Sequence, residues 1–305
     1  MLNTGPDEEP DDWRARVSTS DSPHASRPPG LFSGRPPLEI LVPVALSEHE
    51  DDRVALAARY GRFWSLPLRL VHVRTPAQPA DGETGLGAEV TRLRSSHPEQ
   101  VIAGEVVEAD SVASGIGQVA TDRSVVFLPS QRGSRWLDEQ SVGVTVVHTF
   151  SGLAMLYGPE CHDPPIGTSV IVPLDGSRLA ERAIEPAMAV ATTSGAIVRL
   201  VTVMPAASID AASELLLEGV VDSERRYLRR ITSRYEEAPV DLRWETTSRD
   251  DPVAGIDAMA AEHGSSLIVA ATHGDSNGER QLFGSVCMGL VEQGRVPVLI
   301  VTPGA

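Results

Sequence analysis

The sequence predicts an α/β fold in which two similar units follow one another, each a parallel sheet built from βαβ units. Short apolar runs alternate with Ala-rich helical stretches, which is typical of βαβ units with right-handed crossovers. The pattern Leu-Val-Pro-Val at 41–44 returns as Ile-Val-Pro-Leu at 171–174, so the unit occurs twice. Aromatic residues make up only 4% of the chain, and an aliphatic core suits a buried parallel sheet.

The first unit is expected to follow a tail, residues 1–36, that is rich in Pro, Ser, Asp and Glu. The tail has no periodic apolar pattern, so we expect it to be disordered. Beyond it, each apolar run predicts a strand and each Ala-rich or longer polar stretch predicts a helix. The expected strands of the first unit are 38–44, 68–73, 101–108 and 124–128, and the expected helical stretches are 54–59, 87–97 and 111–121.

The second unit repeats this order. Its expected strands are 169–174, 197–203, 240–244, 267–270 and 296–301, and its expected helices are 183–191, one within 211–236, and 252–263. Helical spacing places one group of residues on or near the apolar face of the helix within 211–236. They are Leu215, Leu216, Val220, Val221, Tyr227, Leu228 and Ile231.

The join between the units lies in a stretch rich in Pro and Gly, residues 158–167. We therefore expect a first domain at 37–158, a linker at 159–168 and a second domain at 169–305.

The composition excludes several classes of function. A net charge of −16 disfavours binding to nucleic-acid phosphates, although a local basic patch stays possible. The chain has no lysine, which excludes a Walker A loop and Schiff-base chemistry. No apolar run reaches the roughly 18 residues of a membrane helix, and the acidic first residues lack a signal-peptide core. The simplest interpretation is a soluble cytoplasmic protein.

One loop indicates a ligand site. The run 266–270 leads into Ala271-Thr272-His273-Gly274, and nine residues later the chain reads Gly284-Ser285-Val286. Glycine lets the backbone approach an anion closely, and the free N–H groups at a helix start favour negative charge. An apolar strand, a glycine loop and a Gly-Ser helix start together predict a phosphate site.

This spacing resembles the nucleotide loop of the universal stress protein family, Gly, two residues, Gly, nine residues, Gly and Ser or Thr. Gly274, Gly284 and Ser285 match the pattern, and Ala271 replaces the first glycine. The resemblance covers about 38–303. It implies two tandem, five-stranded, Rossmann-like domains related to adenine-nucleotide α-hydrolases, which pair through their last strands. It also implies binding of ATP or a related adenine nucleotide with Mg²⁺.

Ligands of open α/β sheets bind beyond the carboxyl ends of the strands where the strand order reverses. In the second unit three segments are expected to meet there. The expected contact residues are Pro173, Leu174, Asp175, Val203, Ala270, Ala271, His273, Gly274, Arg280, Gly284, Ser285 and Val286. The resemblance puts Asp175 on the adenosine side, Arg280 near phosphate, and Ser285 on phosphate at the start of the last helix.

Several of these residues can also be explained by ordinary structural roles without a ligand. Asp175 in Asp-Gly-Ser is also good turn or N-cap chemistry, and Ser285 can simply cap a helix. An exposed Arg280 and a structural His273 are the commoner cases, and no metal-ligand partner is seen for the histidine. At Ala271 a small residue suffices unless φ is positive or the backbone must touch the ligand. In those cases the methyl group costs about 1 kcal/mol or blocks binding.

The first unit keeps the spacing and loses the chemistry. Its loop reads Ser130-Gln-Arg-Gly133 and, after nine residues, Gly143-Val144, so valine stands in the serine position. Ala45 stands where the second unit has Asp175. We expect no nucleotide or a much weaker site there, in a copy retained as a partner surface.

No catalytic constellation is found. The chain lacks a GxSxG elbow, an HExxH motif and a CxxC pair. Cys287 is expected to be a packing residue, with a reactive thiol as the alternative. The leading hypothesis is a nucleotide-binding stress or regulatory protein without catalysis beyond slow ATP hydrolysis. The alternatives are a nucleotide-free tandem scaffold and an enzyme related to adenine-nucleotide α-hydrolases. The expected partners are an adenine nucleotide and an unidentified protein, with an internal domain pair or homodimer and no nucleic acid or membrane.

Overall fold

In the computed structural model, all residues that the structure describes belong to one compact unit within 32–305. They are residues 37–46, 51–76, 82–129, 142–150, 152–158, 160–161, 164, 166–167, 169–204, 206, 211–272 and 285–302. The expected tail at 1–36 lies outside them.

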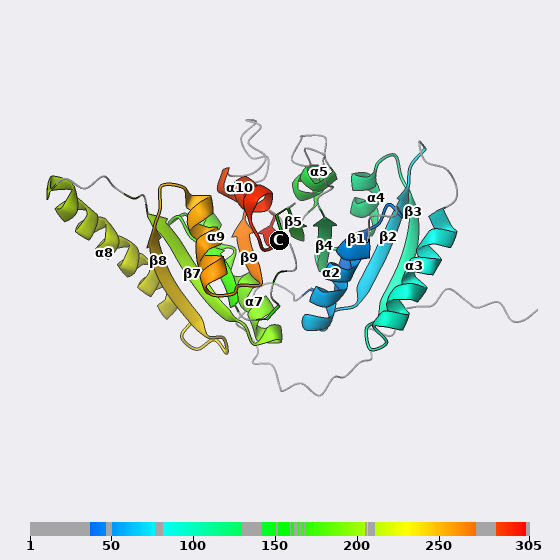
Figure 1. Cartoon of the computed structure of the whole chain (residues 1–305), viewed down its shortest axis with the longest axis horizontal. Helices are drawn as coiled ribbons and strands as arrows, with labels where there is room; N and C mark the ends of the chain where they lie inside the picture. The colour runs from blue at the N-terminus through cyan, green and yellow to red at the C-terminus, as the bar shows by residue number, and fades with distance from the viewer. Residues whose placement is uncertain are drawn as a thin grey trace, which may run out of the picture. The chain divides into compact units, whose positions relative to one another are not determined.

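Strands and helices alternate through both halves, as the sequence predicts (Figure 1). The first half contains β1 (Glu39–Pro43), α2 (Asp51–Phe63), β2 (Leu68–Arg74), α3 (Gly82–Ser96), β3 (Ile102–Glu108), α4 (Val112–Val119), β4 (Ser124–Pro129), α5 (Val142–Thr149) and β5 (Leu153–Tyr157). The second half contains β6 (Ser169–Pro173), α6 (Arg178–Glu181), α7 (Ile184–Ser194), β7 (Ile197–Met204), α8 (Ala211–Ser233), β8 (Leu242–Ser248), α9 (Pro252–Glu262), β9 (Leu267–Ala271), α10 (Ser285–Gln293) and β10 (Val298–Val301).

The ten strands form one sheet in the order β3-β2-β1-β4-β5-β10-β9-β6-β7-β8. Within each half all neighbouring strands are parallel, and the two halves join where β5 pairs antiparallel with β10, Met155 facing Leu299. The expected tandem of five-stranded parallel units, paired through their last strands, is therefore confirmed. The domain bounds at 159–168 stay a prediction.

Helices cover both faces of the sheet, and each face buries an aliphatic core. On one face the strands pack against α2, α3, α7 and α8 through residues such as Leu70 and Leu228. On the other face they pack against α4, α5, α9 and α10 through residues such as Val126 and Ile256. The low aromatic content thus corresponds to a Val-, Ile-, Leu- and Ala-rich interior, as expected.

One expected strand was misplaced. The strand expected at 240–244 begins at Leu242, which faces Val198, and continues to Ser248. The Asp241 carbonyl accepts a bond from the Val198 N–H at the start of that pairing. Thr246 and Thr247 extend the strand as β-branched residues. Because β8 is an edge strand with a polar outer half, hydrophobicity alone put it too early.

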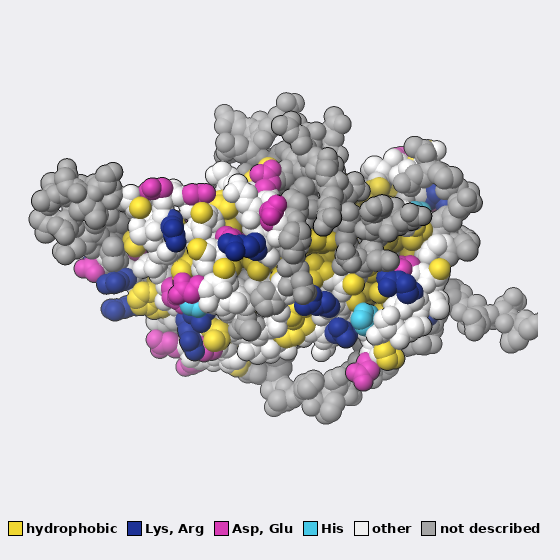
Figure 2. Space-filling view, in the orientation of Figure 1, with side chains coloured by type: hydrophobic (Ala, Val, Ile, Leu, Met, Phe, Trp, Pro, Cys, Tyr) yellow, Lys and Arg dark blue, Asp and Glu magenta, His cyan; other side chains and the backbone are white. Residues whose placement is uncertain are grey.

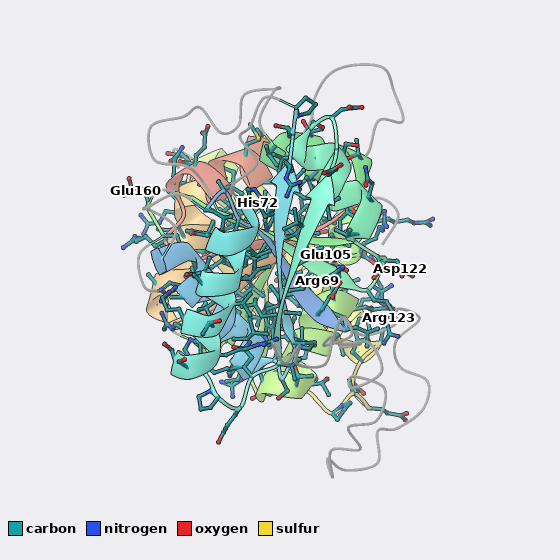
Figure 3. The ribbon with its side chains drawn as sticks, turned by 90° about the vertical axis from the view of Figure 1, so that its right-hand side faces the viewer. Arg69, His72, Glu105, Asp122, Arg123 and Glu160 are labelled. Carbon is teal, nitrogen blue, oxygen red and sulfur yellow. The ribbon has the colours of Figure 1, made fainter. Side chains whose placement is uncertain are left out.

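The repeat extends to an arginine–glutamate ion pair in each half, which is buried in the first half and partly buried in the second. Arg69 and Arg199 hold equivalent positions in β2 and β7, where they face Leu41 and Ile171. Arg69 bonds Glu39 at 2.5 Å and Glu105 at 3.0 Å (Figure 3), whereas Arg199 bonds Glu245.

Equivalent register relates the carboxylates as well. Glu105 faces Val71 and Glu245 faces Val201, so the arginine–glutamate bridge across neighbouring strands is duplicated. In the second half His263 adds a contact of 2.8 Å to Glu245. The duplicated bridge shows that the two halves share more than their strand order.

Candidate functional site

The second half offers a site where its strand order reverses. β6 lies between β9 and β7, and the chain leaves β6 toward α7 on one face and leaves β9 toward α10 on the other. Loops that diverge in this way open the place where doubly wound sheets bind ligands. The expected site residues sit at the ends of these strands and at the start of α10.

Asp175 follows β6 in a tight turn. Leu174 is buried, and its N–H donates to the Val201 carbonyl at 2.8 Å, which fixes the end of the strand. The Asp175 side chain is exposed, and its Oδ1 accepts a 2.9 Å bond from the Ser177 N–H. Gly176 between them has φ +83°. The turn interpretation of Asp175 is therefore observed, and it presents the carboxylate at the surface.

Ser177 caps the next helix. Its Oγ accepts a 3.1 Å bond from the Ala180 N–H at the start of α6. The cap that the sequence allowed at Asp175 thus lies two residues later, so Asp175 orders the turn without being the cap itself.

Ala271 ends β9 in regular strand geometry. It faces Val301 in β10, and it is not among the residues with positive φ, which outside glycine are Leu46 and Ser65 in the described chain. Its side chain is half-buried on the core face that α7 covers, and Ala270 before it is buried on the opposite face. The methyl group of Ala271 therefore causes no backbone strain.

The first turn of α10 lies close to the end of β9 and to the turn at Asp175 that follows β6. Ser285 is exposed at the helix start, and Val286 behind it is half-buried. The buried Cys287 Sγ lies 3.8 Å from the Ala271 carbonyl oxygen. Burial raises the pKa of Cys287 to about 11, with a smaller contribution from the nearby Asp175 carboxylate. The ends of β6 and β9 and the start of α10 thus converge.

Pro173 and Val203 lie at the ends of β6 and β7, where the sequence places them, and their contact with a ligand stays a prediction. Pro173 is half-buried as the last residue of β6. Val203 packs against α9: a Cβ built on Gly255 would lie 2.8 Å from the Val203 Cγ1. Its side chain is partly buried and packs against the core beside α9.

Four expected residues lie outside the described part of the chain: His273, Gly274, Arg280 and Gly284. Their roles stay predictions.

Two buried hydroxyls at the same ends of the strands were not predicted. Thr272 is 2% exposed and Thr202 is 6% exposed, and the Oγ1 atom of each has no hydrogen-bond partner among the residues that the structure describes. A buried hydroxyl without a partner is costly and is unusual in a native protein. In the sequence, each of these threonines comes toward the end of an apolar strand, where valine would pack equally well. A hydroxyl at such a position is the signal that could have indicated them.

The corresponding loop of the first half has another form. Val44 and Leu174 are equivalent, because each donates its N–H to the matching strand residue, Val71 or Val201, at 2.9 and 2.8 Å. Ala45 therefore stands in the place of Asp175, as the sequence predicts. Leu46 stands in the place of Gly176 and keeps a left-handed conformation with φ +59°.

Leu46 also fills space. A Cβ built on Gly85 of α3 would lie 3.4 Å from Leu46 Cδ1, so the leucine packs against that helix. His72 of β2, whose counterpart in the second half is Thr202, is buried, with Nδ1 3.0 Å from the Val44 carbonyl oxygen (Figure 3). The first half thus presents Ala45 and Leu46 where the second half presents Asp175 and Gly176.

Neither a metal centre nor a membrane-spanning helix is found in the part of the chain that the structure describes. Within the described ranges, no group of three or more His, Cys, Asp or Glu side chains is arranged to hold a metal ion. No helix in these ranges is long and apolar enough to cross a membrane.

The fold and the position of the site define a tandem, doubly wound, Rossmann-like α/β protein. Residues 168–302 match the universal stress protein family. The second half of this chain is therefore a universal stress protein domain. No curated protein matches the sequence significantly.

Solved structures show the same fold across most of the chain. A functionally unknown protein of Pseudomonas aeruginosa PAO1 is 15% identical and has a TM-score of 0.63, covering 87% of this chain and 92% of its own. A universal stress protein of Archaeoglobus fulgidus is 18% identical with a TM-score of 0.53, covering 87% and 96%. A protein of P. aeruginosa UCBPP-PA14, described as a candidate universal stress protein, is 15% identical with a TM-score of 0.59, covering 89% and 94%. At these identities the likeness shows the fold.

Proposed function

We propose that the second half binds an adenine nucleotide, ATP foremost, with Mg²⁺, and that binding regulates a cytoplasmic stress-response protein. The observation that carries this proposal is the convergence of the exposed Asp175 carboxylate, the end of β9 at Ala271 and the start of α10. These three segments come together inside the domain that matches the universal stress protein family.

The residues present fit such a ligand. Asp175 can accept hydrogen bonds from ribose or base donors, because its carboxylate is exposed and only Oδ1 is used by the turn. α10 has nine residues and starts with the exposed Ser285, so its free N–H groups and the serine hydroxyl suit phosphate. The ordinary strand geometry of Ala271 supports tolerance of alanine in place of glycine.

The first test is to purify the protein without added nucleotide, denature it and separate the supernatant by anion-exchange chromatography. About one equivalent of adenine nucleotide per chain supports the proposal. Titration calorimetry with Mg·ATP then compares the wild type with Gly284→Val and Ser285→Val, which remove close approach and the hydroxyl donor. Loss of binding in both variants is the expected result.

One matched control and one further site variant locate the nucleotide site. Gly143→Val changes the equivalent position of the first half and should leave ATP binding intact. Asp175→Asn keeps a turn acceptor and should reduce affinity, because a neutral amide oxygen accepts more weakly than a carboxylate. ATP binding that survives both Gly284→Val and Ser285→Val overturns the proposed site.

A nucleotide-free scaffold is the second candidate. It is favoured by the first half, where Leu46 and Ala45 replace the glycine and the carboxylate of the second. In this case the purified protein is empty and Mg·ATP at millimolar concentration leaves its melting temperature unchanged.

We propose no catalytic role in either case. Turnover of ATP well above that of the Gly284→Val variant would instead indicate an enzyme.

A further inference from the structure

The C-terminal half of α8 carries an arginine face: Arg225, Arg226, Arg229 and Arg230. Residues four apart lie above one another on a helix, so 225 and 229 form one row and 226 and 230 form the next. All four side chains are exposed. Leu228 and Ile231, on the other side of the helix, are 0% and 1% exposed and anchor α8 to the core.

Among the side chains that the structure describes, no carboxylate forms an ion pair with any of these guanidinium groups. Arg226 donates to the backbone carbonyl of Asp222 at 3.2 Å. The guanidinium groups of Arg229 and Arg230 lie 5.9 and 5.7 Å from the ring centres of Trp244 and Tyr227. No ion pair is formed by any of the four within the described residues, although the chain as a whole carries a net charge of −16.

Contacts with aromatic rings position two of these guanidinium groups, those of Arg229 and Arg230. Trp244 lies in β8, the edge strand of the sheet, and Tyr227 donates its hydroxyl to Glu181 of α6 at 3.4 Å. An arginine stacked on a ring keeps its N–H groups free for an anion at the rim. Figure 2 shows basic side chains along the lower left margin, beside this part of α8.

We propose that the arginine face of α8 binds a short acidic segment of a partner protein. Its four cations lie within the six residues 225–230. From the first to the last they span about 7.5 Å of helix axis, which matches two or three residues of extended peptide. Guanidinium forks pair with carboxylates in bidentate geometry. A duplex nucleic acid requires contacts over a longer surface and is repelled by the acidic remainder of the chain. This interaction is independent of the nucleotide site.

The test uses the full chain and a fluorescein-labelled hexaglutamate peptide, followed by fluorescence anisotropy at low ionic strength. We expect saturable binding that weakens as NaCl rises to about 0.5 M, because exposed charges are screened. The variant R225E/R229E should bind about tenfold more weakly, since reversal replaces attraction by repulsion at two sites. Trp244 fluorescence should change on binding, because Arg229 covers that ring.

The matched control is R62E/R92E, which makes the same change in net charge on exposed arginines of α2 and α3. It should bind hexaglutamate like the wild type, and circular dichroism should show both variants folded. A hexaglutamine peptide should not bind. The proposal is overturned by absence of hexaglutamate binding, by equal weakening in both variants, or by preferred binding of a duplex DNA oligonucleotide or anionic vesicles.

Discussion

The backbone conformation of Ala271 is fixed by strand pairing with β10. Ala271 lies in β9 with ordinary strand geometry, so this position does not require the additional backbone conformations that glycine allows. We expect Ala271→Gly to lower the free energy of unfolding by about 0.5–1 kcal/mol through backbone entropy. Mg·ATP affinity should change by less than about threefold, under 0.7 kcal/mol. Denaturant unfolding and calorimetry measure both; binding that tightens tenfold would mean that the methyl group obstructs the ligand.

The two cysteines should be inert in the folded protein. Burial raises the pKa of Cys161 to about 12 and that of Cys287 to about 11. At pH 8 the thiolate of Cys287 is then populated at about one part in a thousand, and the thiolate is the nucleophile. Reaction with dithiobis(nitrobenzoate) should therefore be slow in buffer and complete for both thiols in denaturant. Rapid labelling of Cys287 in the native state would support a reactive thiol.

The two ion pairs of the buried Arg69 should differ in their contribution to the free energy of unfolding. The Glu39 side chain is 5% exposed, whereas that of Glu105 is 39% exposed. Glu39→Ala leaves an inadequately compensated buried charge and should cost about 3 kcal/mol. Glu105→Ala removes a partly solvated pair and should cost less than about 1 kcal/mol. Urea unfolding compares the two; equal losses would show that burial does not determine the contribution.

Among the elements, the β1–α2 loop is the place where the two halves diverge most clearly. Leu46 keeps the left-handed conformation of its counterpart Gly176, with φ +59° against +83°. Such a conformation costs a leucine about 1–2 kcal/mol relative to glycine. Packing of Leu46 on α3 at Gly85 offsets this cost. At this position the first half thus has the same left-handed conformation as the second, with a leucine in place of the glycine that suits it.

Two substitutions separate strain from packing at Leu46. Leu46→Ala removes the packing and keeps the strain, whereas Leu46→Gly removes both. The glycine variant should therefore be more stable than the alanine variant by about 1 kcal/mol in thermal unfolding. Gly176→Ala is the matched control, since its Cβ would meet nothing within 4 Å, and it should lose a similar amount through strain alone. A more stable alanine variant at 46 would contradict the assigned conformation.

Sequence patterns located most elements because a buried parallel strand is a continuous apolar run. β1, β2, β6 and β7 begin within one residue of their expected starts. β5 and α5 were implied only by the family's five-stranded sheet, although Leu153–Tyr157 is itself an apolar run. At the proposed site, the family resemblance suggested Asp175 and the loop spacing suggested Ser285, and their roles as ligand contacts stay predictions. The sequence could not reveal that the Thr202 hydroxyl lacks a partner among the described residues, because hydrogen-bond satisfaction depends on neighbours distant in sequence.

At the scale of the whole molecule, the two halves share one sheet. β5 and β10 pair through four residue positions each, and both strands are buried. Tyr60 of α2 donates its hydroxyl to the Ser266 carbonyl at 2.5 Å across the halves, and it is fully buried. Gly158 lies so close to α10 that a Cβ there would meet the Val291 carbonyl oxygen at 1.7 Å. The halves are therefore expected to hold together without a covalent connection.

Cutting the linker tests this expectation. A protease site inserted between residues 163 and 164 should be cleaved without separating the halves, because pairing of β5 with β10 satisfies the backbone groups of both strands. Size-exclusion chromatography of the cut protein should give the elution volume of the uncut chain, and two fragments should appear only in denaturant. Tyr60→Phe leaves the Ser266 carbonyl without its donor at a cost of about 1–3 kcal/mol. The cut variant should thus dissociate at a lower urea concentration than the cut wild type. Fragments that elute separately in buffer would show that the covalent linker, rather than the shared sheet, holds the two halves together.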